Sequence, residues 1–188
     1  MHRLFLLAAV LLLGYSFGTR AAQTQNNLLT PHAGDLVCLQ SDKTVPFTDR
    51  SFFSASFTIL YFSAGWCPDC RKFSPELVAA YDAQPPTHRD FEVLFISQDR
   101  SEAEMRKYMT IEKMRWPALA YDKVPTAQDL ARYHPNKSIP WLAVIDRSGR
   151  VVLESESDKD ASDVLKRLQN KLADSARRSG APASSGRD

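Results

Sequence analysis

The sequence is poor in cysteine. Its 188 residues contain three, Cys38, Cys67 and Cys70. Three thiols leave at least one unpaired, and they are too few for a scaffold that depends on disulfides in place of a core. The chain therefore needs an apolar core, and its hydrophobic content of 44% is ordinary for a globular protein.

An apolar run long enough to span a bilayer is also missing. Leu4–Gly14 is apolar but short, and it follows a basic start at Arg3. Small residues at Thr19 and Ala21 suit a cleavage site, so we interpret residues 1–21 as a secretory signal peptide. The alternative is an uncleaved N-terminal anchor.

No excess of charge of either sign marks the rest of the chain. Removing the signal takes away Arg3 and Arg20 and leaves 22 basic and 22 acidic residues. This balance gives no indication of nucleic acid or of an anionic membrane as a partner. Contact with a membrane is expected only through a signal that stays uncleaved.

The pattern of apolar residues predicts one domain over residues 35–175. It follows a polar lead-in at 22–34 and precedes a disordered, Gly/Ala/Ser-rich tail at 176–188. Helix-separated strands followed by a hairpin predict an α/β fold with a mixed central β-sheet and helices on both faces. We expect strands at 35–40, 56–64, 91–99, 139–146 and 150–155, and helices after Cys70, after Ser101, from Thr126 to about His134, and over 161–172.

The segment WCPDC places two cysteines three residues apart at a strand-to-helix junction. Both thiols should lie on one side of the first helical turn. Cys67 stands at the helix start, where free backbone N–H groups and the helix dipole favour a thiolate. This spacing provides a nucleophile, Cys67, and a sheltered resolving thiol, Cys70.

The residues beside the pair should tune its reactivity. Pro68 stiffens the turn, and the carboxylate of Asp69 opposes a neighbouring thiolate. Arg71 and Lys72 act in the opposite direction. We expect the dithiol–disulfide couple to have a reducing to intermediate reduction potential.

Two other interpretations of the pair remain open. A zinc site needs about four ligands, and the chain offers only Cys38 and the scattered His32, His88 and His134 besides the pair. A purely structural disulfide would close too small a loop to stabilise the fold much. Cys38 itself lies in an apolar strand and is interpreted as a small hydrophobic residue or, less favourably, as a third redox thiol.

The motifs YFSAGWCPDCRKFSPEL, FEVLFISQD and RWPALAYDK…SIPWLAVID, in this order, resemble the thioredoxin superfamily, and within it the tryparedoxin/nucleoredoxin-like branch. The resemblance covers residues 35–172. It implies the thioredoxin fold and thiol–disulfide exchange by Cys67 and Cys70. We expect no cofactor and no metal.

The resemblance also implies a substrate surface. It places a cis peptide at Ile139–Pro140 next to the cysteines, with the Ile139 backbone binding the substrate as an added strand. Trp66, which precedes the nucleophile, is expected to be a flat contact surface at this site. Tyr61 stands where ordinary thioredoxins have a buried aspartate, and the bulk of Trp141 is expected to narrow the substrate groove.

These features predict an exported thiol–disulfide oxidoreductase that acts as a monomer and reduces protein disulfides in the periplasm. An exported reductase requires a thiol electron donor in the cell envelope. A dedicated cytochrome-c-maturation or oxidative-folding factor is an alternative within the same chemistry. A redox-inactive thioredoxin-fold module that only binds client proteins is an alternative of another class.

Overall fold

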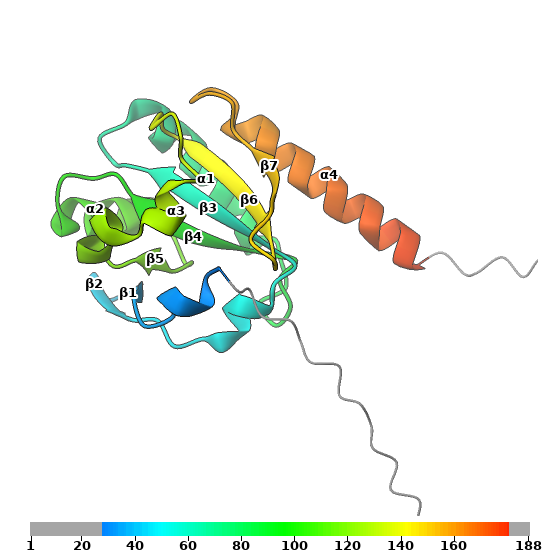
Figure 1. Cartoon of the computed structure of the whole chain (residues 1–188), viewed down its shortest axis with the longest axis horizontal. Helices are drawn as coiled ribbons and strands as arrows, with labels where there is room; N and C mark the ends of the chain where they lie inside the picture. Colours follow the sequence, from blue (N-terminus) through cyan, green and yellow to red (C-terminus); the bar gives the residue numbers. More distant parts are fainter. Residues whose placement is uncertain (1–27, 181–188) are drawn as a thin grey trace, which may run out of the picture.

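The computed structural model describes residues 28–180, which form one seven-stranded sheet with helices around it (Figure 1). The strands lie in the order β2-β1-β5-β4-β3-β6-β7. Their bounds are β1 Leu36–Gln40, β2 Lys43–Pro46, β3 Phe57–Ser63, β4 Phe91–Ser97, β5 Ala118–Leu119, β6 Trp141–Asp146 and β7 Val151–Glu154. The α-helices are α1 Pro68–Asp82, α2 Glu102–Ile111, α3 Gln128–Ala131 and α4 Ala161–Gly180, and the 3-10 helices are η1 Thr30–His32, η2 Arg50–Ser54 and η3 Tyr121–Thr126.

The centre of the sheet consists of the strands predicted from continuous apolar runs. β3 pairs in parallel with β4 and antiparallel with β6, so that Tyr61 lies between Phe95 and Leu142. All seven residues of β4 are buried. A strand buried on both faces requires such a run, because alternation of polar residues would bury unpaired polar groups. The predicted mixed sheet is confirmed.

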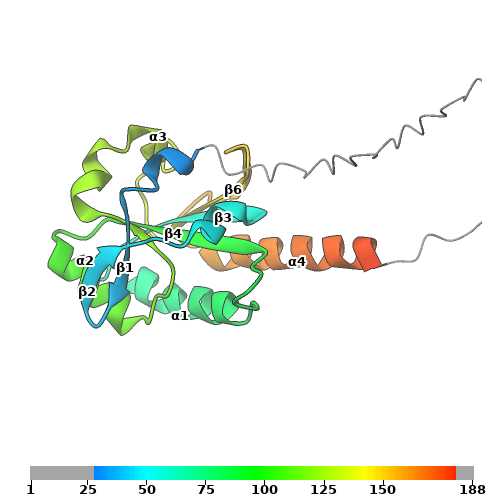
Figure 2. The ribbon, with the colours of Figure 1, turned by 90° about the horizontal axis from the view of Figure 1, so that it is seen from below.

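Helices cover both faces of this sheet, as predicted. One face packs against α1, α2 and α4, and the other packs against α3 with η1 and η2 (Figure 2). Alternate residues of β3 serve the two sides. Ile59 and Tyr61 contribute to the first core, whereas Leu60 and Phe62 contribute to the second.

Local signals were partly correct. The Ser101 side chain accepts a hydrogen bond from the Glu104 N–H at the start of α2, as a capping residue should. The helix expected from Thr126 to about His134 is shorter, because α3 spans only Gln128–Ala131 and the Thr126 hydroxyl donates to the Lys123 carbonyl and does not cap it. Strand β2, which pairs with β1, has no counterpart among the expected strands.

The boundaries of the domain differ at both ends from those predicted. Leu29, in the expected lead-in, is fully buried in the core beside α3. Helix α4 continues to Gly180, so residues 176–180 are helical where a disordered tail was expected. The proposed signal peptide and residues 181–188 lie outside the described residues. Within residues 28–180, no helix is both long and apolar enough to cross a membrane.

Candidate active site

The two cysteines of WCPDC lie at the first turn of α1. Cys67 is the N-cap residue, and its sulfur accepts a hydrogen bond from the Cys70 N–H at 3.3 Å. The helix therefore begins by directing one of its free N–H groups at the Cys67 sulfur, where it favours a thiolate. Both thiols are free. Cys67 is 6% exposed and Cys70 is fully buried, so the order of accessibility agrees with the prediction although Cys67 is more covered than expected.

The residues expected to tune the pair hold the turn in shape. Pro68 occupies the first helical position, where its missing N–H costs no hydrogen bond. Asp69 forms an exposed ion pair with Lys72 at 2.9 Å. The Lys72 ammonium therefore offsets part of the electrostatic effect of the Asp69 carboxylate on the thiols. The Arg71 guanidinium donates to the Gly65 carbonyl at 2.7 Å and closes the turn from outside.

The Ile139–Pro140 segment faces the pair. Its peptide bond is cis, as predicted. The Cys67 thiol donates to the Ile139 carbonyl oxygen at 3.5 Å, which fixes this loop beside the sulfur. Within the described part of the chain, no hydrogen-bond partner of the Ile139 N–H is found. This N–H, beside the Cys67 sulfur, is therefore available to an added strand.

The expectation that Trp141 narrows the substrate groove is wrong. Its side chain is 2% exposed, and its indole N–H donates to the Tyr133 carbonyl in the core on the α3 side of the sheet. The cause is strand alternation. Leu142, the next residue of β6, packs with Cys67 and Cys70 on the opposite face.

Trp66 is the exposed aromatic surface that was predicted. It is 46% exposed, and its indole N–H donates to the Gln98 carbonyl at 3.0 Å. The guanidinium of Arg100 lies over the ring, 5.7 Å from its centroid. The tryptophan is thus tied to the residue that follows β4 and stays half-exposed beside Cys67.

Asp99 is a site residue that the sequence analysis did not identify. Its carboxylate accepts hydrogen bonds from the Gly65 N–H and the Ser97 hydroxyl, each at 2.8 Å. Burial raises the pKa of this carboxyl, and the two hydrogen bonds oppose that rise. Gly65 has no room for a side chain, because a Cβ there would lie 2.9 Å from the Cβ of Tyr108. The Asp99 carboxylate and the Tyr108 side chain thus restrain the Gly65 backbone from two sides.

Four buried hydroxyl groups meet below Cys70. This hydroxyl cluster consists of Tyr61 and Ser63 from β3, Ser74 from α1 and Tyr108 from α2. The Tyr61 hydroxyl bonds with Ser74 and accepts from Ser63, both at 2.9 Å, and Tyr108 bonds with Ser63 and with Ser74. The Ser74 hydroxyl also contacts the Cys70 carbonyl oxygen at 2.8 Å. Tyr61, the residue expected in place of a buried aspartate, thus has three hydroxyl partners.

The cluster lies in a strongly desolvated environment. Burial raises the pKa of the Cys70 thiol, hydrogen bonding with Cys67 raises it further, and the Ser63 hydroxyl lowers it. Burial likewise raises the pKa of Tyr108 to about 12 and that of Tyr61 well above its ordinary value. All three groups therefore stay protonated at neutral pH, and Ser63 is the side chain that favours the Cys70 thiolate.

The remaining candidate ligands do not join the pair. Cys38 is half-buried in β1, which β5 and β4 separate from β3 in the sheet. The His32 imidazole contacts Asp129 at 2.8 Å on the α3 side, and His88 lies exposed in the loop before β4. Among residues 28–180, no three His, Cys, Asp or Glu side chains gather as a metal site would need.

The fold and the dithiol define a class of proteins that exchange thiols and disulfides at the start of a helix. Comparison with known families agrees: the family model described as thioredoxin-like matches residues 56–151. The chain belongs to this family of thiol–disulfide oxidoreductases, in its tryparedoxin/nucleoredoxin-like branch.

Individual relatives support the branch. The nucleoredoxin of Danio rerio is 34% identical over 105 residues, which are 56% of this chain and 25% of that protein. The tryparedoxin of Trypanosoma brucei brucei is 36% identical over 98 residues, 52% of this chain and 66% of that one. The chain thus matches about a quarter of the nucleoredoxin length.

Solved structures show the same fold. The structure of tryparedoxin from Trypanosoma brucei has a TM-score of 0.55 and 30% identity, and the match covers 72% of this chain and 92% of that one. Tryparedoxin I from Crithidia fasciculata has a TM-score of 0.56 and 28% identity, with 77% and 94% covered. The predicted thioredoxin fold is confirmed.

Proposed function

We propose that this protein reduces protein disulfides, with Cys67 as nucleophile and Cys70 as resolving thiol. The observation that carries this assignment is the pair of contacts at the Cys67 sulfur. The Cys70 N–H donates to it at 3.3 Å, and the Ile139 carbonyl lies 3.5 Å away. One contact favours the thiolate, and the other, which the protonated thiol makes, places the Cys67 sulfur where a client strand would dock.

The reaction proceeds in two exchanges. The Cys67 thiolate attacks one sulfur of a client disulfide, the S–S bond breaks, and the client's other sulfur leaves as a thiolate. Cys70 then loses its proton and attacks the Cys67 sulfur of the mixed disulfide. This step releases the second client thiolate and leaves a Cys67–Cys70 disulfide, so two electrons pass to the client. A thiol donor restores the pair.

Client recognition is proposed to use the backbone at Ile139. The unpartnered Ile139 N–H and the second lone pair of its carbonyl can bond an extended client strand, while Trp66 supports its side chains. Buried Pro140 fixes the edge on which that strand would lie. Specificity would then come from side chains beside the cysteine, because backbone pairing is indifferent to sequence.

The setting is proposed from the signal-like N-terminus. Export would place the protein, as a monomer, in the periplasm, with a thiol donor of the cell envelope as its source of electrons. Cell fractionation with antibodies against the native chain tests this part independently of the chemistry.

Reduction of insulin disulfides with dithiothreitol as donor tests the activity. Wild-type protein should accelerate insulin precipitation, and the Cys67→Ser variant should not. Cys70→Ser should accumulate a mixed disulfide with the client, visible on non-reducing gels and lost on reduction. A binding module without redox activity would give no acceleration, and equal trapping by both variants would contradict the assigned roles.

A further inference from the structure

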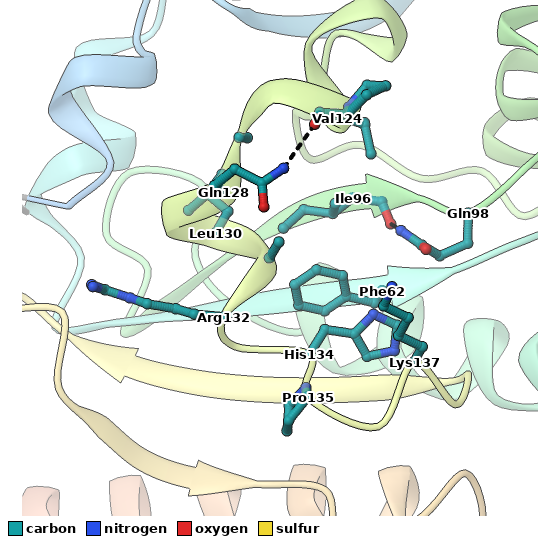
Figure 3. A pocket seen from close by; sticks show the side chains of 13 residues that line it. Phe62, Ile96, Gln98, Val124, Gln128, Leu130, Arg132, His134, Pro135 and Lys137 are labelled. Atoms are coloured by element: carbon teal, nitrogen blue, oxygen red, sulfur yellow. Dashed lines mark hydrogen bonds between the residues drawn. The ribbon is translucent and has the colours of Figure 1, made fainter.

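A groove of about 530 Å³ lies on the α3 side of the sheet (Figure 3). Part of its lining, which we call the floor, is apolar and includes Phe62, Ile96, Val124 and Leu130, and polar groups line the rest. The ring of His134 stacks on Phe62 with centroids 4.5 Å apart, so the imidazole is part of this floor. Such a floor offers room for one or two apolar side chains of a ligand.

The charged groups around this floor are all of one sign. Arg132 and Lys137 are exposed, and the thirteen residues that line the groove contain no aspartate or glutamate. In Figure 3 the two cations lie on opposite sides of Phe62 and His134. Arg132 is held in place, since its guanidinium donates to the Tyr133 hydroxyl at 3.0 Å. The groove therefore complements an anionic ligand with an apolar part.

The groove is continuous with the candidate active site. Lys137 stands two residues before Ile139, which is at most about 7 Å along the chain. The His134 ring donates from Nε2 to the Ser138 carbonyl at 2.7 Å. This hydrogen bond joins the lining of the groove to the segment that carries Ile139 and Pro140. On the other side, Gln98 lines the groove while its carbonyl accepts the Trp66 indole N–H.

We propose that this groove binds an acidic segment of the client, with an apolar residue among its acids, that flanks the disulfide to be reduced. The inference rests on the proposed function, since a strand docked on Ile139 would run past Lys137. Residues 22–27 carry no charge, and residues 181–188 contain one arginine and one aspartate, so neither stretch has the acidic character that the groove complements. The client's acids meet Lys137 and Arg132, and its apolar side chain enters between them.

Matched peptides test this selectivity. Each carries one cysteine as a thiopyridyl mixed disulfide, flanked two to four residues away, on either side, by Glu-Leu-Asp, Gln-Leu-Asn or Lys-Leu-Lys. The rate constant for thiopyridone release by reduced protein is measured under second-order conditions. We expect the acidic peptide to react about fivefold faster than the neutral one on one of the two sides, and the basic peptide to react more slowly. The preference should shrink as salt is added.

Variants identify the groove as the cause. Removing both cations by Arg132→Gln and Lys137→Gln should abolish the preference. A control with the same change in net charge, Lys166→Gln with Lys171→Gln on exposed positions of α4, should retain it. Lys137→Gln alone serves if the double variant is unstable, because Lys137 is exposed and makes no ion pair within residues 28–180. It should lower the preference by about half.

Dipyridyl disulfide, which is small and neutral, separates this inference from the proposed function. Equal rates for the three peptides, with normal reduction of the small disulfide, would overturn the groove and leave the dithiol chemistry intact. A preference that survives loss of both groove cations, or that the α4 control also loses, would equally overturn it. Failure with the small disulfide would overturn the proposed function itself.

Discussion

Alternate residues of β3 reach the two faces of the sheet, and the two faces have different interiors. Tyr61 and Ser63 bring hydroxyl groups to the face covered by α1 and α2, where they meet two more. Leu60 and Phe62 bring only hydrocarbon to the opposite face, beside Phe52 of η2. One strand thus supplies hydroxyl groups to the face below the dithiol and hydrocarbon to the core on the opposite face, which we call the apolar face.

This difference separates stability from chemistry. The apolar face contributes mainly through apolar burial, whose free energy scales with the buried area. The hydroxyl cluster gains little net stability from its hydrogen bonds, because each replaces a bond to water. What it provides is a set of donors and acceptors next to a thiol that must lose its proton during exchange. Each of the changes below acts on one face of the sheet or on the exposed surface of the Cys67–Cys70 turn.

The largest effect, on stability, is expected on the apolar face. Phe52 is 1% exposed and packs edge-on against Phe47 and Phe53, with centroids 5.6 and 5.2 Å away. Phe52→Ala should lower the free energy of unfolding by about 3–5 kcal/mol through lost burial and a cavity. Urea denaturation measures this. The reduction potential of the folded variant should be unchanged, and a shifted potential would show that the faces are not separate.

Alkaline pH should act on the polar face. Burial raises the pKa of the Cys70 thiol, of Tyr61 and of Tyr108, the last to about 12 from 10.0. In the unfolded chain these groups ionise first, so folding stability is complete below about pH 9 and falls as pH rises toward 12. The loss should be about 1.4 kcal/mol per pH unit for each group that remains protonated.

A tyrosine variant checks the origin of this loss. Urea denaturation at pH 8, 9, 10 and 11 should show a shallower decline for Tyr108→Phe than for the wild type above about pH 10, because one titrating phenol is gone. The absolute stability of this variant is lower at every pH, so only the slopes are compared. Parallel slopes would mean that Tyr108 ionises normally in the folded protein.

Loss of one hydroxyl should slow the resolving step. Ser63 favours the Cys70 thiolate, so Ser63→Ala should raise the pKa of that thiol and slow release of client from a preformed Cys67 mixed disulfide by about tenfold. The pH–rate profile should move to higher pH. Thr58→Val is the matched control, since it exchanges a buried hydroxyl for a methyl in β3 on the other face. Equal slowing by both changes would contradict a role specific to the cluster.

The sequence predicted the parts of the site that are local. An apolar strand, a CxxC at its end and an X-Pro before a later strand identify the fold and the dithiol with few residues. The hydroxyl cluster escaped because its members come from three elements, with Ser63 and Tyr108 45 positions apart. Two spacings were a partial signal. Ser63 is two residues from Tyr61 on one side of a strand, and Ser74 is four residues from Cys70 on one side of a helix. β2 escaped because KTVP is short and half polar.

The smallest effect is expected at the surface of the turn. Asp69 lies beside the dithiol, and its carboxylate disfavours a thiolate, so Asp69→Asn should stabilise the reduced pair and raise the reduction potential. The structure limits the size of this change. Asp69 is exposed and already pairs with Lys72, and exposed charges interact weakly through water.

A charge interaction of that kind corresponds to about 5–20 mV for a two-electron couple. Redox titration against glutathione measures the shift, and Asp163→Asn, an exposed position on α4, controls for the change in net charge. Removing both partners of the ion pair, with Asp69→Asn and Lys72→Gln, should return the potential close to its starting value. A fall in potential for Asp69→Asn would mean that the carboxylate acts by holding Lys72 near the thiols and not by its own charge.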